Sequence, residues 1–119
     1  SGVILMYPNS KQPKSSTMDN CILTCAMIKD GRGYNDGEIV FLTQLVHLPP
    51  NLVQLYYSHS IKIINKIKEL NLDNETTWRS LYDNHVKEIM ILIRNKNFSL
   101  VVGQIQKMIL ELEQTYGVN

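Results

Sequence analysis

The chain has 119 residues, of which 44% are hydrophobic and 19% charged, and its formal net charge is +1. Such a composition is typical of one globular domain that buries its own core, and the charge balance disfavours a general nucleic-acid-binding protein. No apolar run reaches the 18 or so residues that cross a bilayer, so we expect no membrane span.

Two features of the sequence bear on its cellular context. Cys21 and Cys25 are too few for a disulfide framework and stand one helical turn apart, which indicates reduced thiols. We therefore expect an intracellular protein, cytoplasmic or nuclear. The chain starts with Ser-Gly and has no initial Met, which indicates a fragment of a larger protein.

The amino-terminal part divides at residue 16. Residues 1–16 form a partly disordered arm in this interpretation, with an apolar run over 3–7 and a polar, proline-containing tail behind it. Residues 17–119 are expected to form a single helical domain. Its first helix is predicted over 18–29, capped by Thr17 and ended by Asp30-Gly31. Because residues 21–28 are apolar nearly all round, a buried strand is the alternative.

Two further helices meet at a pair of prolines. Asn35 to Glu38 has the pattern of an amino-terminal cap, and the helix that follows ends before Pro49. The clearest helix of the chain is predicted over 51–71. One face of it carries most of the apolar residues, namely Leu52, Leu55, Tyr56, His59, Ile63, Ile67 and Leu70.

The remaining sequence predicts two more helices. Asp73 or Asn74 caps a helix over 75–94, and Asn95-Lys96-Asn97 breaks the chain. The last helix covers 98–116 and ends at Gly117, where a left-handed backbone is favourable. We therefore predict an all-α fold, a compact bundle of four to five helices with a flexible N-terminal arm.

The residue types that carry chemistry show no catalytic pattern. His59 and His85 each fall within the apolar stripe of a helix, where a core histidine is favoured over a metal site or a Cys-His pair formed with Cys21 or Cys25. The carboxylates are dispersed and no phosphate-binding loop is present. We predict no enzyme, no catalytic residue, no cofactor and no metal site.

The helix predicted over 51–71, which we call the central helix, has more apolar surface than a single core-facing side requires. Beside its main face lies a second apolar strip, and the fourth helix carries one apolar residue on its polar side. Either the central helix is covered on two sides, or part of this surface binds a partner. We predict a non-enzymatic interaction module that binds a protein or peptide partner or forms a homo-oligomer. The candidate partner-binding residues are Val53, Tyr57, Ile61, Ile64 and Ile91.

The alternative function is nucleic-acid binding. The helix at 50–71 follows a sharp proline corner, as in a helix-turn-helix domain, and would act as the recognition helix. Its cations and one from the fourth helix offer a candidate basic face, made of Lys62, Lys66, Lys68 and Arg94. Few cations lie among the residues that would enter a groove, so this alternative is the weaker of the two.

Overall fold

The computed structural model describes residues 21–31 and 48–118, and within these ranges the fold is all-α, as predicted. The arm at 1–16, the cap at Thr17 and the helix expected after Asn35 lie outside the described residues. The helical elements are α3 (Ile22–Lys29), α5 (Pro50–Glu69), α6 (Glu75–Leu81), the π-helical turn η3 (Tyr82–Val86), α7 (Lys87–Arg94) and α8 (Phe98–Tyr116).

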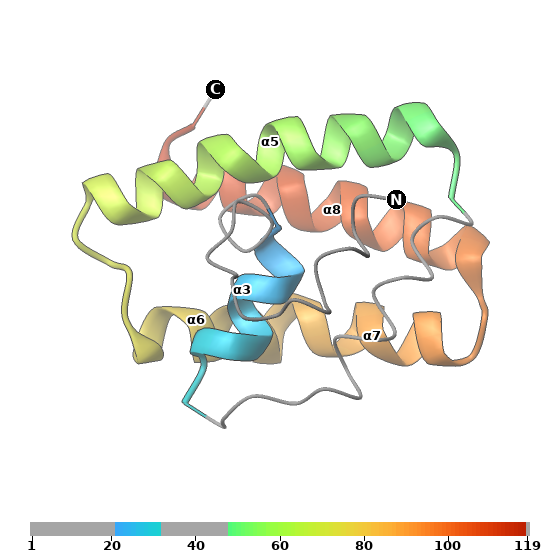
Figure 1. Ribbon diagram of the computed structural model, residues 1–119, viewed down its shortest axis with the longest axis horizontal. Coiled ribbons are helices and arrows are strands. Elements are labelled where there is room, and N and C mark those ends of the chain that lie inside the picture. Colours follow the sequence, from blue (N-terminus) through green and yellow to red (C-terminus); the bar gives the residue numbers. More distant parts are fainter. Residues whose placement is uncertain (1–20, 32–47, 119) are drawn as a thin grey trace, which may run out of the picture.

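The long helices form two layers (Figure 1). Helices α5 and α8 lie side by side and run in the same direction, whereas α6, η3 and α7 form one continuous rod that runs the opposite way. Helix α7 packs on α8, and the short helix α3 fills the space between α5 and α6. None of the helices in the described part of the chain combines the length and the apolar composition needed to cross a membrane.

Helix α3 is the innermost element. Its residues 22–27 are all buried, which explains why this stretch is apolar on every side. The structure resolves the choice between strand and helix in favour of helix, but the expected start at Met18 is wrong. Cys21 has an extended backbone, with φ −125° and ψ 110°, and its thiol accepts a hydrogen bond from the Thr24 amide. Cys21 is therefore the cap, and the helix begins at Ile22.

The first amides of α3 are buried and take their hydrogen-bond acceptors from α5. The Ile22 amide donates to Ser60 Oγ at 2.9 Å, and the Leu23 amide donates to the Tyr56 hydroxyl oxygen at 3.1 Å. Because these amides have no partner within their own helix, side chains from elsewhere must satisfy them. Helix α5 thus provides a tertiary cap for α3.

The other end of α3 is bound to α6 and to the segment before it. The Arg79 Nε donates to the Asp30 carbonyl at 2.9 Å, and Lys29 Nζ lies 3.2 Å from Asp73 Oδ1. The same carboxylate oxygen accepts a hydrogen bond from the indole of Trp78 at 2.7 Å. Burial alone would raise the pKa of Asp73, but the bonds from Trp78 and Lys29 outweigh it and lower this pKa below its ordinary value.

The predicted ends of α5 are confirmed. Pro49 is the residue before the helix and Pro50 is its first residue, where a missing amide hydrogen costs nothing. Beyond the last turn, Asn71 has a φ of 63°, and the Leu72 amide returns to the Ile67 carbonyl at 2.9 Å. This is the left-handed termination for which Asn is well suited.

The segment at 75–94 is helical throughout, as predicted, with one irregularity that the sequence did not indicate. Asn74 Oδ1 accepts from the Thr77 amide at 3.0 Å and so caps α6. Within η3 the Lys87 amide bonds to the Tyr82 carbonyl, five residues back, so the helix holds one extra residue in that turn. Helix α8 begins and ends where the sequence placed it, and Gly117 has a φ of 72°.

Candidate docking surface

The face of helix α5 that is buried differs from the predicted one. Its buried residues are Tyr56, Ser60, Ile63, Ile64 and Ile67, so the buried face is rotated by roughly 60° from the predicted stripe. The reason is that α5 contacts two neighbours, α3 on one side and α8 on the other. Leu55, which was assigned to the core face, is 54% exposed, and that assignment was wrong.

A shallow apolar groove follows the line where α5 meets α8. It has a volume of about 130 Å³. Two leucines in its lining, Leu55 from α5 and Leu110 from α8, are 54% and 57% exposed. The lining residues are Leu52, Leu55, Tyr56, His59, Ile105, Gln106, Ile109, Leu110 and Glu113. We call this surface the α5/α8 face.

One polar pair lies within the α5/α8 face. His59 Nδ1 and Glu113 Oε2 are 2.6 Å apart, and both side chains are partly buried. This hydrogen bond joins α5 to α8 and gives both side chains a partner within the chain. The rest of the lining is apolar apart from the neutral amide of Gln106 and the hydroxyl of Tyr56. The face therefore suits an apolar, uncharged partner surface better than a charged ligand.

The five predicted partner-binding residues do not form one surface. Ile64 is completely buried, so its inclusion in an accessible strip is corrected. Val53 and Tyr57 are partly buried and line a separate hollow of about 450 Å³, together with Leu48, Pro50 and Gln54. Ile61 is partly buried, and Ile91 is 41% exposed on α7, which packs on α8 rather than on α5.

Sequence reasoning missed Leu110, although a signal for it exists. On the helix predicted over 98–116, the pattern of apolar residues predicts a buried stripe made of Val101, Ile105, Met108, Leu112 and Tyr116. Leu110 falls outside that stripe, as Ile91 falls outside the stripe of its own helix. An apolar residue on a polar face was considered for the fourth helix only, so the leucine that lines the groove was overlooked.

Another partly buried histidine, His85, does not line the groove. His85 lies in η3, and its Nδ1 is 3.7 Å from Glu111 Oε1 on α8. Burial lowers the pKa of His85, and the Lys107 charge adds to this, although the nearby Glu111 carboxylate opposes it. His59 and His85 thus bind different carboxylates of α8 and do not face one another across the core.

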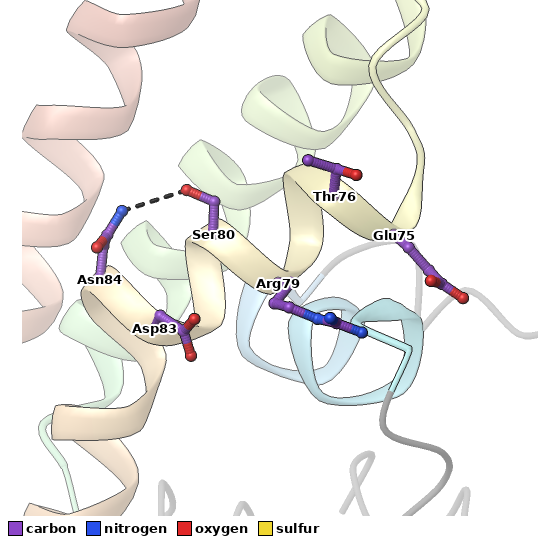
Figure 2. Close-up of a pocket in the computed structure, with 6 residues that line it drawn as sticks. All are labelled: Glu75, Thr76, Arg79, Ser80, Asp83 and Asn84. Atoms are coloured by element: carbon purple, nitrogen blue, oxygen red, sulfur yellow. Dashed lines mark hydrogen bonds between the residues drawn. The ribbon is translucent and has the colours of Figure 1, made fainter.

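A polar hollow of about 390 Å³ lies along α6 and η3 (Figure 2). Arg79 extends toward the end of α3, where it bonds the Asp30 carbonyl, and Asn84 Nδ2 donates to Ser80 Oγ at 3.2 Å. Its residues are exposed. They are Glu75, Thr76, Arg79, Ser80, Asp83 and Asn84. Exposed side chains, of which Arg79, Ser80 and Asn84 already have hydrogen-bond partners, are typical of a solvated helix face.

The buried Cys21 and Tyr56 also have a structural role. The Cys21 sulfur lies 3.1 Å from the Tyr56 hydroxyl, beside the amides of α3 that both side chains cap. Burial, followed by the proximity of Cys21, raises the pKa of Tyr56 well above its ordinary value. Tyr56 therefore stays protonated as a hydrogen-bonding group. No group of three metal-ligating side chains occurs within residues 21–31 and 48–118.

The structure separates Arg94 of the candidate basic face from its three lysines, Lys62, Lys66 and Lys68, which all lie on α5. Lys66 and Lys68 lie in the last turn of α5, and Lys66 pairs with Glu69 at 3.4 Å. Arg94 ends α7 at the opposite end of the molecule (Figure 1). The helix that would precede α5 in a helix-turn-helix lies outside the described residues.

Comparison of the chain with protein-family models, with curated proteins and with solved structures gave no match.

Proposed function

We propose that the chain is a non-enzymatic interaction module that associates with a second copy of itself through the α5/α8 face. The observation that carries this proposal is that Leu55 and Leu110, each more than half exposed, line one apolar groove from two different helices. Fully burying a leucine contributes about 1.5–3 kcal/mol. Covering the exposed half of each of these leucines therefore contributes about 1 kcal/mol per residue in each copy.

The charges of the α5/α8 face favour a second copy as the partner. In a twofold dimer both copies contribute the same charges to the interface, so a face that carries unpaired charges of one sign would be repulsive. Here the single carboxylate, Glu113, is already bonded to His59. The groove lining has no other charged side chain.

The test compares two leucines of α8. Leu110→Glu places a carboxylate at the groove, whereas Leu100→Glu changes a leucine of similar exposure, 54%, that does not line the groove. An unpaired buried polar group costs about 1–3 kcal/mol, and a dimer contains two copies of it. We expect Leu110→Glu to weaken dimerisation at least about 30-fold in light scattering over a concentration series, and Leu100→Glu to leave it unchanged.

The companion variant Leu55→Glu should behave like Leu110→Glu, since both residues are exposed and neither change should unfold the monomer. Circular dichroism of each variant checks this. A wild-type chain that stays monomeric at millimolar concentration would refute the proposal. So would a dimer that Leu55→Glu and Leu110→Glu leave intact.

A further inference from the structure

The net charge of the α5/α8 face depends on one proton. His59 Nδ1 and Glu113 Oε2 are 2.6 Å apart, and their side chains are 34% and 17% exposed. Because a carboxylate only accepts hydrogen bonds, Nδ1 carries the hydrogen of this bond. A second proton therefore adds at Nε2, and it changes the charge of the pair without breaking the bond. The pair has one net negative charge when the imidazole is neutral, and none when the imidazole is protonated.

The other titratable groups near His59 come from all three packed helices. Tyr56 precedes it by one turn on α5, and Tyr116 lies on α8 one turn beyond the carboxylate. Burial raises the pKa of both tyrosines, so both stay neutral below about pH 8. From α3, the Cys21 thiol lies 3.1 Å from the Tyr56 hydroxyl. Lys62, three residues after His59, is an exposed cation outside the groove lining.

Among the described residues that line the groove, His59 is thus the one of a type whose charge ordinarily changes between about pH 8 and pH 5. We infer that protonation of His59 strengthens the association of two copies through the α5/α8 face. The proposed dimer is then pH-dependent, and this step rests on the proposed function.

Two physical effects give the inference its sign. In a twofold dimer both copies contribute the same charge, so neutral imidazoles bring two net negative charges into one interface. Association also removes water from the Glu113 carboxylate, and burying a charge whose partner is uncharged is unfavourable. A proton on each His59 removes the net charge and supplies the missing counter-charge.

The size of the effect is set by screening. In about 0.15 M salt the Debye length is about 8 Å, and we expect the dissociation constant of the dimer to fall roughly three- to tenfold from pH 8 to pH 5.5. Protonation of the chain's three histidines also makes each copy more positive, which opposes association. The test therefore compares variants with one another at the same two pH values.

His59→Gln is the reference variant, because it lacks the group that gains the proton and so measures the response of the rest of the chain. From about pH 8 to about pH 5.5, wild type should gain affinity relative to this reference in light scattering over a concentration series. His85→Gln is the matched control. His85 is partly buried beside Glu111 and does not line the groove, so this variant should keep the wild-type response.

Glu113→Gln should reverse the sign. The amide oxygen of glutamine still accepts the bond from His59 Nδ1, but the pair is now uncharged at the higher pH and has one positive charge at the lower pH. This variant should therefore lose affinity relative to His59→Gln as the pH falls. A role of Glu113 that is only structural would weaken the dimer at both pH values without reversing its response.

The outcomes separate the inference from the proposed function. A wild-type response equal to that of His59→Gln would overturn the inference and leave the dimer standing. So would a Glu113→Gln variant that gains affinity in acid as wild type does. Circular dichroism at both pH values checks that each variant is folded, and His59→Asn replaces His59→Gln if that variant unfolds. If wild type is monomeric at both pH values, the proposed function itself is refuted.

Discussion

Ser60→Ala is the sharpest test of how α3 is held in the core. Ser60 is fully buried, and its hydroxyl oxygen accepts the hydrogen bond of the Ile22 amide at 2.9 Å. Alanine is nearly the same size but leaves that buried amide without an acceptor, which costs about 1–3 kcal/mol. Alanine also favours the helix by about 0.5 kcal/mol relative to serine. The net loss in the free energy of unfolding should therefore be about 0.5–2.5 kcal/mol.

The matched control is Ser58→Ala on the same helix. Ser58 is exposed, and its hydroxyl donates to the Leu55 carbonyl within α5, so nothing buried loses a partner. Here only the helix preference changes, and the variant should be as stable as wild type or slightly more stable. The two serine changes thus have opposite expected signs although they differ by two positions.

Urea denaturation followed by far-ultraviolet circular dichroism measures both effects. With a slope of about 2 kcal/mol per molar urea, Ser60→Ala should lower the midpoint by roughly 0.3–1.2 M. Tyr56→Phe, which removes the acceptor of the Leu23 amide, should lower it comparably. If Ser60→Ala is as stable as Ser58→Ala, the tertiary cap contributes nothing and the account of α3 is wrong.

Three further predictions concern the core, two glycines and one carboxylate. Ile89→Ala should cost about 2–5 kcal/mol as a core cavity, and an unchanged urea midpoint would mean that Ile89 is not in the core. Gly103→Ala should stabilise the fold by up to about 1 kcal/mol in thermal melts, because nothing beyond the neighbouring helix backbone lies within 4 Å of the added carbon. Gly117→Ala should destabilise the fold, because Gly117 has a φ of 72°. The pKa of Asp73 is lowered in the folded state from 3.8, so its stabilising effect is complete above pH 3.8 and is lost as the pH falls through the folded pKa. Asp73→Asn should therefore be less stable than wild type at pH 7, and the gap should shrink below about pH 4; a gap that grows in acid would contradict the Trp78 and Lys29 bonds.

The sequence predicts the ends of helices better than their orientation. The stops at Asn71, at Asn95-Lys96-Asn97 and at Gly117 are confirmed, because each depends on a local backbone preference. The orientation of α5 depends instead on where α3 and α8 pack against it. The spacing of apolar residues in the sequence carries no information about that packing. That is why Leu55 was assigned to the core and Ile64 to a partner surface, when their burial is the reverse.

Two other features depend on contacts between distant residues. The start of α3 was placed at Met18 because Thr17 is a good cap, whereas the helix begins where Ser60 and Tyr56 can receive its amides. The π-helical turn at 82–86 has no marker in the sequence, since it contains neither proline nor glycine. The groove also depends on contacts between distant residues. In the sequence Leu110 is a single apolar residue, and it becomes part of a groove only because α8 packs beside α5.

The most direct test of the central proposal is a dilution series of amide ¹H–¹⁵N correlation spectra from the wild-type chain. If two copies meet on the α5/α8 face, concentration-dependent shifts should concentrate at residues 52–59 and 105–113. The amides of α6 around the polar hollow, such as Ser80, should not shift. Spectra that do not change with concentration, or shifts centred on the hollow beside Val53 and Tyr57, would contradict the account.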